Sequence, residues 1–312
     1  MNQEWLIGID LGGTKTEVVL LDRDSREHFR ERRPTPAGNY PGTLATIHAL
    51  VEEAEASAGR RGLPVGVGIP GSVSRLTGGV KNGNSIWLNG QPMAEDLERL
   101  LGRPVVLTND ANCLALSEAT DGAGQGYPVV FAAILGTGCG AGMSIDGRLL
   151  TGPNGVAGEW GHNPLPWTPD GELLGRPCFC GRHGCNETFL SGTGLARTHQ
   201  RLWGAAMDAR QVVELSAAGD GPARQTMSQY LEHLARGLAG VINVLDPDVI
   251  VLGGGMSNVP GIYSELPERL PRYVFGGECD TPVLSARHGD SSGVRGAAWL
   301  GAPGALGSVV PR

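Results

Sequence analysis

Residues 5–22 read WLIGIDLGGTKTEVVLLD. A short apolar run that ends at Asp10 and a β-rich run over residues 16–22 stand on either side of the turn LGGTK, so the stretch predicts a strand, a glycine turn and a second strand. In phosphate-binding P-loops and dinucleotide fingerprints the glycine turn leads into a helix, whereas β-branched residues follow the turn here. The turn contains neither GxxxxGKS/T nor GxGxxG. We therefore expect a β-hairpin that belongs to neither motif.

The same arrangement occurs again from residue 129. VVFAAI, LGTGCGAG and MSIDGRLL predict another strand, glycine turn and strand, which indicates that the chain is internally duplicated. Elsewhere, strand-like runs alternate with segments of helical periodicity over residues 43–58, 93–102 and 225–245. This alternation predicts an α/β fold.

The length of the chain predicts two lobes. Its 312 residues are many for a single hydrophobic core, because cores stop growing near ~250–300 residues. The glycine-rich stretch TDGAGQGYP provides the most suitable boundary, near residues 118–128. We expect an N-terminal α/β lobe over residues 1–118, joined by a C-terminal helix near residues 293–312, and a larger C-terminal α/β lobe over residues 119–292.

The composition narrows the classes of partner. The net charge is −7 and no Lys/Arg cluster follows a helical face, so we do not expect the protein to bind nucleic acid. We expect small molecules as its ligands. The first ten residues lack the pattern of a secretory signal. The longest apolar run, residues 129–135, is far shorter than the ~20 residues of a membrane-spanning helix. We expect a cytoplasmic protein with no membrane partner.

The two glycine turns are suited to bind a polyphosphate, because glycine lets backbone N–H groups approach the phosphate oxygens. One such turn alone is more often an ordinary tight turn, but its repetition in two similar settings favours phosphate binding. Asp10 ends the first strand and is a candidate to hold Mg²⁺ through water. A further glycine run, residues 253–255, follows a later predicted strand.

The dipeptide Asn109-Asp110 follows a strand-like run and precedes a helix-like one. One interpretation is that one of the two side chains caps the helix. The other is catalytic: a carboxylate at the carboxyl end of a strand lies where ligands of α/β proteins usually bind, and it can take a proton from a hydroxyl that attacks phosphorus. The two roles are compatible, and Asp110 is our candidate base.

Half of the six cysteines lie in RPCFCGRHGCNETF, residues 176–189. In a reducing compartment, clustered cysteines favour a metal or redox site over disulfides. Structural Zn²⁺ needs four nitrogen or sulfur ligands, and this stretch supplies three thiolates: Cys178, Cys180 and Cys185. His162 and His183 are the candidates for the fourth ligand, and we favour His162. A redox pair at Cys178 and Cys180, or thiols without a role, remain alternatives.

EWGH at residues 159–162 presents a carboxylate and an imidazole three positions apart, and Glu187 lies two positions beyond Cys185. Such groups form hydrogen bonds with adjacent sugar hydroxyls. A sugar that cannot form these bonds leaves polar groups of the site unpaired and therefore binds more weakly. A glutamate or histidine in a loop is, by itself, more often simply solvated. The stretch is therefore a candidate sugar-binding segment only in combination with the other motifs.

Taken together, these motifs resemble a known family. IGIDLGGTKTEVVLLD, LTNDANCLALSEA, LGTGCGAGM, GEWGHNPLP and CFCGRHGCNE are similar to the ROK family of sugar kinases and related repressors, over essentially the whole chain. The resemblance implies a two-lobed ribonuclease-H-like ATPase fold of the actin, hexokinase and Hsp70 type, with a zinc-binding loop and an active site in the cleft between the lobes. It also implies ATP, Mg²⁺ and structural Zn²⁺ as cofactors, and a homodimer.

The resemblance further implies roles for individual residues, with Asp110 as the catalytic base. The positions that match ATP- and magnesium-binding segments are Asp10, Gly12, Gly13, Thr14, Lys15, Gly136, Thr137, Gly138, Gly140, Gly254 and Gly255. Those that match sugar-contacting positions are Asn84, Asn109, Asp110, Glu159, His162 and Glu187. Those that match the zinc ligands are His162, Cys178, Cys180 and Cys185.

Within the family, KNGNSIWLNGQP at residues 81–92, together with EWGHNPLPW and VFGGECDTPV, resembles bacterial fructokinases that also accept mannose. The resemblance thus implies transfer of the γ-phosphoryl group of ATP to the 6-OH of fructose. A glucokinase or N-acetylglucosamine kinase of the same family and a non-catalytic sugar sensor are the alternatives. Repressor members carry an N-terminal helix-turn-helix, for which a strand that begins near Leu6 leaves no room. A zinc hydrolase is excluded because four protein ligands leave no position for water.

Overall fold

The computed structural model describes residues 4–169, 172–259 and 261–306. Two compact units divide the chain. Unit 1 contains the residues up to Gly126, the segment Gly142–Ala157 and the residues from Asp290 onward, and unit 2 contains Tyr127–Ala141 and Gly158–Gly289. The predicted α/β class is confirmed, since both units contain strands and helices. The units assign Gly142–Ala157 together with the N-terminal sheet, whereas the sequence analysis puts this segment in the larger lobe; the division into lobes stays a prediction.

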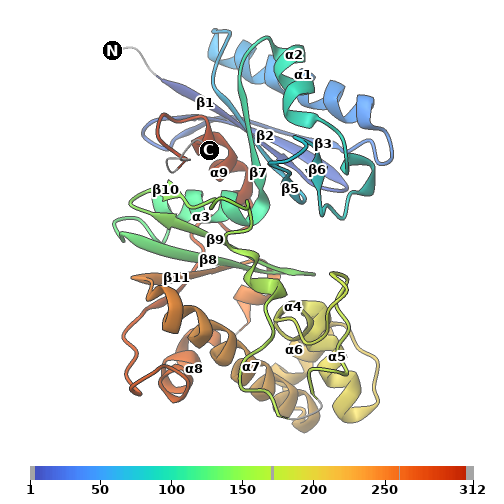
Figure 1. The fold of residues 1–312 in the computed structure, drawn as a ribbon, viewed down its shortest axis with the longest axis vertical. Coiled ribbons are helices and arrows are strands. Elements are labelled where there is room, and N and C mark those ends of the chain that lie inside the picture. Colours follow the sequence, from blue (N-terminus) through green and yellow to red (C-terminus); the bar gives the residue numbers. More distant parts are fainter. Residues whose placement is uncertain (1–3, 170–171, 260, 307–312) are drawn as a thin grey trace. The chain divides into compact units, whose positions relative to one another are not determined.

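Unit 1 is built on a five-stranded sheet of order β3-β2-β1-β4-β7 (Figure 1). The strands β1, β2 and β3 are antiparallel neighbours, and β4 and β7 continue the sheet parallel to β1. In β1 and β2, Leu11 pairs with Thr16, which confirms the predicted hairpin around LGGTK. The bounds of the strands are Trp5–Leu11 (β1), Lys15–Asp22 (β2), Glu27–Pro34 (β3), Val65–Ile69 (β4) and Val105–Asn109 (β7).

Helices cover this sheet. Their bounds are Tyr40–Ala58 (α1), Met93–Leu101 (α2), Asp110–Thr120 (α3) and Ser292–Leu300 (α9). The shorter elements of the unit are β5 (Ser72–Val73), β6 (Val80–Lys81), η1 (Ile86–Leu88), β10 (Arg148–Leu149) and η5 (Gly289–Ser291), of which the last begins in unit 2. Helix α9 ends earlier than the predicted helix over 293–312, of which residues 307–312 lie outside the described part.

Two glycines let α9 lie close to the sheet. A Cβ at Gly8 would be 2.2 Å from the carbonyl oxygen of Val294, and one at Gly66 would be 2.0 Å from that of Ala297. Only a residue without a Cβ therefore fits at either position. These contacts attach the last described helix to the first strands of the chain.

A second five-stranded sheet has the order β10-β9-β8-β11-β12. Within unit 2, β11 pairs in parallel with β8 and with β12. The bounds are Val129–Leu135 (β8), Cys139–Ile145 (β9), Val249–Gly253 (β11) and Val283–Ser285 (β12), and the chain passes from unit 2 into unit 1 within β9. Strands β8 and β9 are joined by a glycine turn, which confirms the second predicted strand, turn and strand.

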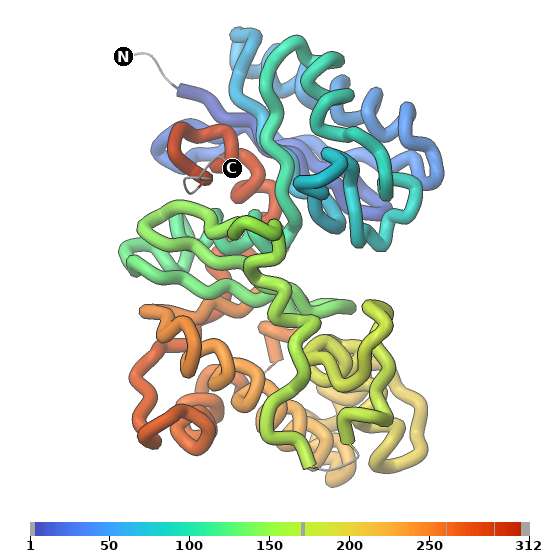
Figure 2. The backbone as a smooth tube through the Cα atoms, viewed as in Figure 1, coloured from blue at the N-terminus to red at the C-terminus, as the bar shows by residue number. Residues whose placement is uncertain are grey.

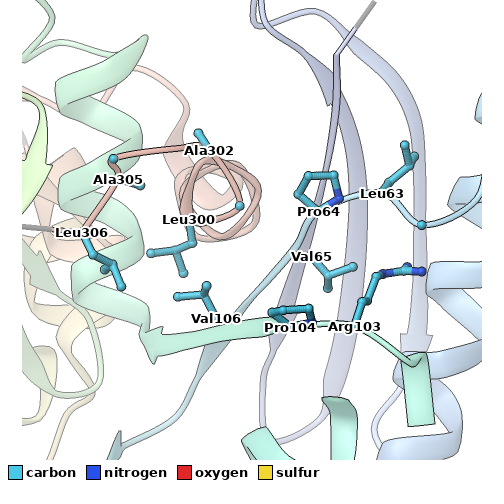
Figure 3. A pocket seen from close by; sticks show the side chains of 13 residues that line it. Leu63, Pro64, Val65, Arg103, Pro104, Val106, Leu300, Ala302, Ala305 and Leu306 are labelled. Atoms are coloured by element: carbon cyan, nitrogen blue, oxygen red, sulfur yellow. The ribbon is translucent and has the colours of Figure 1, made fainter. Parts of the chain in front are cut away.

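The helices of unit 2 gather around α7, the longest of them, which packs against α4, α5, α6 and α8 (Figure 1). Their bounds are Glu187–Leu190 (α4), Gly192–Trp203 (α5), Ala209–Ala218 (α6), Gly221–Leu245 (α7) and Ile262–Arg269 (α8), with short 3₁₀ helices at Glu159–His162 (η2), Gly255–Asn258 (η3) and Leu270–Arg272 (η4). Residues 163–186 lie between η2 and α4, and the structure describes 163–169 and 172–186 of them, which Figure 2 colours yellow-green. Among the described residues, no helix has both the length and the apolar character that a membrane crossing requires.

Candidate functional site

The first glycine turn, between β1 and β2, is fixed by backbone and hydroxyl hydrogen bonds. The N–H of Gly12 donates to the carbonyl of Lys15 at 2.9 Å. From the end of β3, the hydroxyl of Thr35 donates to the carbonyl of Gly12 at 2.8 Å and its N–H donates to the carbonyl of Thr14 at 3.0 Å. Gly13, Thr14 and Lys15 remain exposed. The turn is thus a held backbone loop with its tip in solvent, which suits contact with an anionic ligand.

Asp10 lies directly before this turn at the end of β1 and is partly buried. Burial raises the pKa of its carboxyl group to about 6, and the nearby carboxylates of Asp110 and Glu17 add to the rise. A Cβ at Gly293, the second residue of α9, would be 3.2 Å from Oδ2 of Asp10. A bound divalent cation would favour the ionised form of this carboxyl group.

Asp110 is the first residue of α3 and is exposed at the carboxyl end of β7. The capping role belongs to Asn109, whose side-chain oxygen accepts the N–H of Asn112 at 2.8 Å. Oδ1 of Asp110 accepts the N–H of Ala111, also at 2.8 Å. The positive end of the helix dipole favours a carboxylate at this position. The predicted cap is therefore present and the side chain of Asp110 is exposed, while the role of Asp110 as base stays a prediction.

Asn84 lies in the loop between β6 and η1 and is exposed. Its neighbour Ser85 is buried, at 2% exposure, and the Ser85 hydroxyl oxygen would be 3.3 Å from a Cβ at Gly13. The loop of Asn84 therefore borders the first glycine turn. Four predicted ligand positions of unit 1, Asp10, Gly13, Asn84 and Asp110, thus belong to elements that end or turn at the same edge of the sheet.

In unit 2, the second glycine turn is closed by a hydrogen bond from the N–H of Gly136 to the carbonyl of Gly138, at 3.0 Å. The start of α5 lies against it. The N–H of Gly192 donates to the carbonyl of Gly136 at 2.8 Å, and the hydroxyl of Thr193 donates to the carbonyl of Thr137 at 3.0 Å. Thr137 itself is exposed.

This contribution of α5 was not predicted from the sequence. Its only signal is the run SGTG at residues 191–194, in which Ser191 is a favourable N-cap residue and its side chain accepts the N–H of Gly194 at 3.0 Å. Nothing in the sequence shows that this helix begins beside a turn more than fifty residues earlier in the chain.

The glycine run after β11 adjoins the second turn. Gly254 has φ of +81°, and a Cβ there would be 2.7 Å from the carbonyl oxygen of Leu135, the residue that precedes the turn. Glycine is needed at this position for both reasons. Gly255 begins η3 and has open space on its Cβ side, and Gly140 lies in β9. Two of the segments predicted to bind nucleotide are therefore neighbours in unit 2.

The four predicted metal ligands gather in one group, with their ligand atoms all within 4.8 Å of one another: His162, Cys178, Cys180 and Cys185. The group contains His162 and not His183, which is exposed. Nδ1 of His162 is 3.5 Å from Sγ of Cys178, and the sulfurs of Cys180 and Cys185 are 3.6 Å apart. A tetrahedral Zn²⁺ site with Zn–S bonds of ~2.3 Å requires ligand separations of about 3.5–3.8 Å. The donor set and these two separations therefore fit zinc.

Buried charges anchor the loop that carries these thiols. Arg176 donates to the carbonyl of Thr188 at 2.9 Å and to the hydroxyl of Thr198 at 3.0 Å, and its guanidinium lies 3.9 Å from the ring centroid of Phe189. Burial lowers the pKa of Arg176 to about 10, so it remains charged at neutral pH. These contacts of Arg176 hold the loop to α4 and α5 in addition to any metal ion that the thiols bind.

Glu159 and His162 are the first and last residues of η2, which packs tightly on the start of β9. A Cβ at Gly161 would be 1.9 Å from the carbonyl oxygen of Cys139, so only glycine fits there. Glu187, the first residue of α4, accepts the N–H of Cys139 at 3.1 Å. The three predicted sugar-contacting residues of unit 2 are therefore arranged around one strand end.

Known proteins resemble this chain over nearly its whole length. Residues 6–302 match the model of the ROK family. An N-acetyl-D-glucosamine kinase of Escherichia coli is 40% identical over 298 residues, which are 94% of this chain and 98% of that protein. The crystal structure of a ROK hexokinase from Thermus thermophilus is 35% identical with a TM-score of 0.84, covering 94% of this chain and 96% of that one. A ROK family glucokinase from Streptomyces griseus, solved in complex with glucose and AMPPNP, is 31% identical with a TM-score of 0.76, covering 95% and 98%.

Proposed function

The chain belongs to the ROK family, and on this premise we propose that it is an ATP-dependent sugar kinase that transfers the γ-phosphoryl group to a hydroxyl group of a hexose. The observation that carries the proposal is Asp110: an exposed carboxylate at the first position of α3, on a backbone that the Asn109 cap holds in place. Kinase chemistry needs such a group to accept the proton of the attacking hydroxyl. The kinases among its relatives support the same class of reaction.

ATP and Mg²⁺ are the proposed cofactors. The exposed residues Gly13, Thr14 and Lys15 and the turn Gly136–Gly138 with Gly140 suit the phosphates, and Gly254 and Gly255 suit the adenosine part of the nucleotide. Asp10 would hold Mg²⁺ through water. The metal, together with the backbone N–H groups, would offset the charge of the transferring phosphoryl group. The complex of the Streptomyces griseus glucokinase with AMPPNP supports an adenine nucleotide as donor.

Zn²⁺ is proposed as a structural ion held by His162 and the three clustered thiols. The separations His162–Cys178 and Cys180–Cys185 fit a closed tetrahedral site, and such a site leaves no position for a catalytic water. When bound, the ion would fix the imidazole of His162 in one orientation, so that η2 presents Glu159 and His162 to the sugar from a rigid base. Burial raises the pKa of the Cys185 thiol, and a bound cation would stabilise its thiolate.

The proposed acceptor is the 6-OH of a hexose, and the proposed sugar-binding residues are Asn84, Asn109, Asp110, Glu159, His162 and Glu187. The relatives favour N-acetyl-D-glucosamine and glucose, whereas the resemblance of residues 81–92 favours fructose and mannose. One hydroxyl or one N-acetyl group can be selected by one or two side chains, so a small change in the pocket can decide the preferred sugar. The homodimer implied by the family resemblance stays a prediction.

A panel of four sugars tests the proposal. The purified protein is assayed with MgATP and N-acetyl-D-glucosamine, glucose, fructose or mannose, and kcat/KM is compared for ADP release that depends on the sugar. We expect at least one sugar to be phosphorylated, with N-acetyl-D-glucosamine or glucose preferred. Preference for fructose would support the interpretation from residues 81–92 instead. Binding of sugars without any phosphorylation would contradict the proposed kinase activity and favour a non-catalytic sugar sensor.

A further inference from the structure

The side chain of Asn89 is hydrogen-bonded to both backbone groups of a single residue, Gly83. Oδ1 of Asn89 accepts the N–H of Gly83 at 2.9 Å, and Nδ2 of Asn89 donates to the carbonyl of Gly83 at 3.0 Å. Gly83 directly precedes Asn84, the proposed sugar ligand of this loop. A primary amide has one donor side and one acceptor side in a fixed plane, so this pairing fixes the peptide planes on either side of Gly83.

Asn89 is itself firmly placed. Its backbone forms a bridge with Val80 in β6, and the next residue, Gly90, donates its N–H to the carbonyl of Val80 at 2.7 Å. The N–H of Asn89 donates to the carbonyl of Ile86 at 3.2 Å, at the end of η1. The amide that holds Gly83 therefore extends from a strand and a helical turn and not from a free loop.

The opposite side of Gly83 is closed by backbone atoms. A Cβ at Gly83 would be 2.6 Å from the carbonyl oxygen of Pro70, and a Cβ at Gly71 would be 2.5 Å from the carbonyl oxygen of Lys81 and 2.7 Å from the nitrogen of Gly83. Gly71 has φ of +103°, which other residues rarely adopt. Gly83 is buried between the Asn89 amide and the segment Pro70–Gly71, whereas the following residue, Asn84, is exposed.

We propose that Asn89 is a positioning residue for sugar binding: by holding the backbone of Gly83, its amide sets the direction in which the Asn84 side chain meets the sugar. This inference rests on the proposed function, since it assumes that Asn84 binds the acceptor. A purely structural staple would affect the stability of the fold but not the affinity for one substrate alone. Because Asn89 acts through Asn84, the effects of replacing the two side chains on sugar affinity should not be additive. Replacing either one should leave ATP binding unchanged.

The test is a double-mutant cycle of Asn89→Ala and Asn84→Ala, with sugar affinity measured by calorimetric titration and KM for sugar and for ATP measured where the protein turns over. The sugar is the preferred one among N-acetyl-D-glucosamine, glucose, fructose and mannose. We expect Asn89→Ala to weaken sugar binding about tenfold, because two backbone hydrogen bonds are lost, while KM for ATP stays within about twofold. The double variant should bind sugar no more weakly than Asn84→Ala alone.

Asn39→Ala is the matched control, because Asn39 also binds backbone through its side chain, at the N-cap of α1, where it accepts the N–H of Gly42 at 3.0 Å. It should lower the melting temperature and leave sugar affinity unchanged. Asn89→Asp serves if Asn89→Ala does not fold: it keeps the acceptor for the Gly83 N–H but turns an oxygen toward the Gly83 carbonyl, so it should also weaken sugar binding about tenfold.

Two results would overturn the inference and leave the proposed kinase function unaffected. One is an unchanged sugar affinity in Asn89→Ala and Asn89→Asp. The other is a loss of sugar-binding free energy in the double variant that equals the sum of the losses in the two single variants. A wild-type protein that binds sugar but transfers no phosphate would overturn the proposed function, and the binding cycle would still decide the role of Asn89. A wild-type protein that binds none of the four sugars would overturn both.

Discussion

The carboxylate of Glu187 accepts the backbone N–H of Cys139 at 3.1 Å. Its other oxygen, Oε1, lies 3.8 Å from the sulfur of Cys178, one of the four clustered metal ligands. A Cβ at Gly138 would be 2.9 Å from Oε2, so glycine is what permits the approach. One side chain thus touches both the end of the second glycine turn and the candidate zinc site.

Glu187→Ala should therefore weaken both metal retention and sugar binding. Removing a group beside a metal ligand typically costs about 10- to 100-fold in metal affinity, and we expect a loss in this range. The measurement is the rate of zinc release to a chromogenic chelator, together with KM for the sugar. Glu214→Ala is the control, because Glu214 is an exposed residue of α6 that forms an ion pair with Arg210. Equal metal release from the two variants would contradict the link.

Zinc itself is tested by content and stability. The purified protein should contain about one equivalent of zinc, and Cys178→Ser should remove it and lower the melting temperature, because a tetrahedral site needs all four ligands. Cys279→Ser, at a cysteine outside the cluster, should keep the metal. The account of this loop fails if atomic absorption finds no metal in the wild-type protein, or if Cys178→Ser retains it.

The raised pKa of Asp10 predicts a pH dependence of stability. Its pKa rises from 3.8 to about 6, chiefly through burial, so the folded state binds this proton more tightly than the unfolded chain does. That contribution to stability is fully present below pH 3.8 and is lost as the pH rises through about 6. Asp10→Asn should stabilise the protein free of Mg²⁺ and nucleotide by roughly 1–3 kcal/mol at pH 8, and by almost nothing at pH 4.

The check is the melting temperature of both proteins between pH 4 and pH 8, with Asp24→Asn, at an exposed carboxylate, as the control. A stabilisation by Asp10→Asn that is the same at both ends of this range would show that burial of the charge is not its cause. Asp10→Asn should in addition lose Mg²⁺-dependent turnover.

The parts of the site that the sequence predicted are those in which the chemistry is local. The hairpin around residues 11–15 follows from glycines between β-branched runs, and the cap at Asn109 follows from a strand that runs directly into a helix. The grouping of His162 with three thiols follows from the tetrahedral requirement of zinc and the surplus of cysteines in one loop.

The missed parts depend on contacts between distant segments. The start of α5 meets the second glycine turn through Gly192 and Thr193, and Arg176 is buried under α4 and α5, but neither contact has a local signature. Asn89 is a polar residue in a polar loop, and only the coordinates of Gly83 give its amide a role. The preferred sugar also could not be predicted from the sequence motifs, because a few side-chain atoms decide it.

The proposed function depends most directly on transfer of a proton from the sugar hydroxyl to the Asp110 carboxylate. Asp110→Asn keeps the size of the side chain at the start of α3 and preserves the Asn109 cap, so the fold should be unchanged. We expect kcat to fall by about 10²–10⁴-fold while calorimetry still detects sugar binding. A variant that binds sugar and retains near wild-type kcat would contradict the role of Asp110 as base.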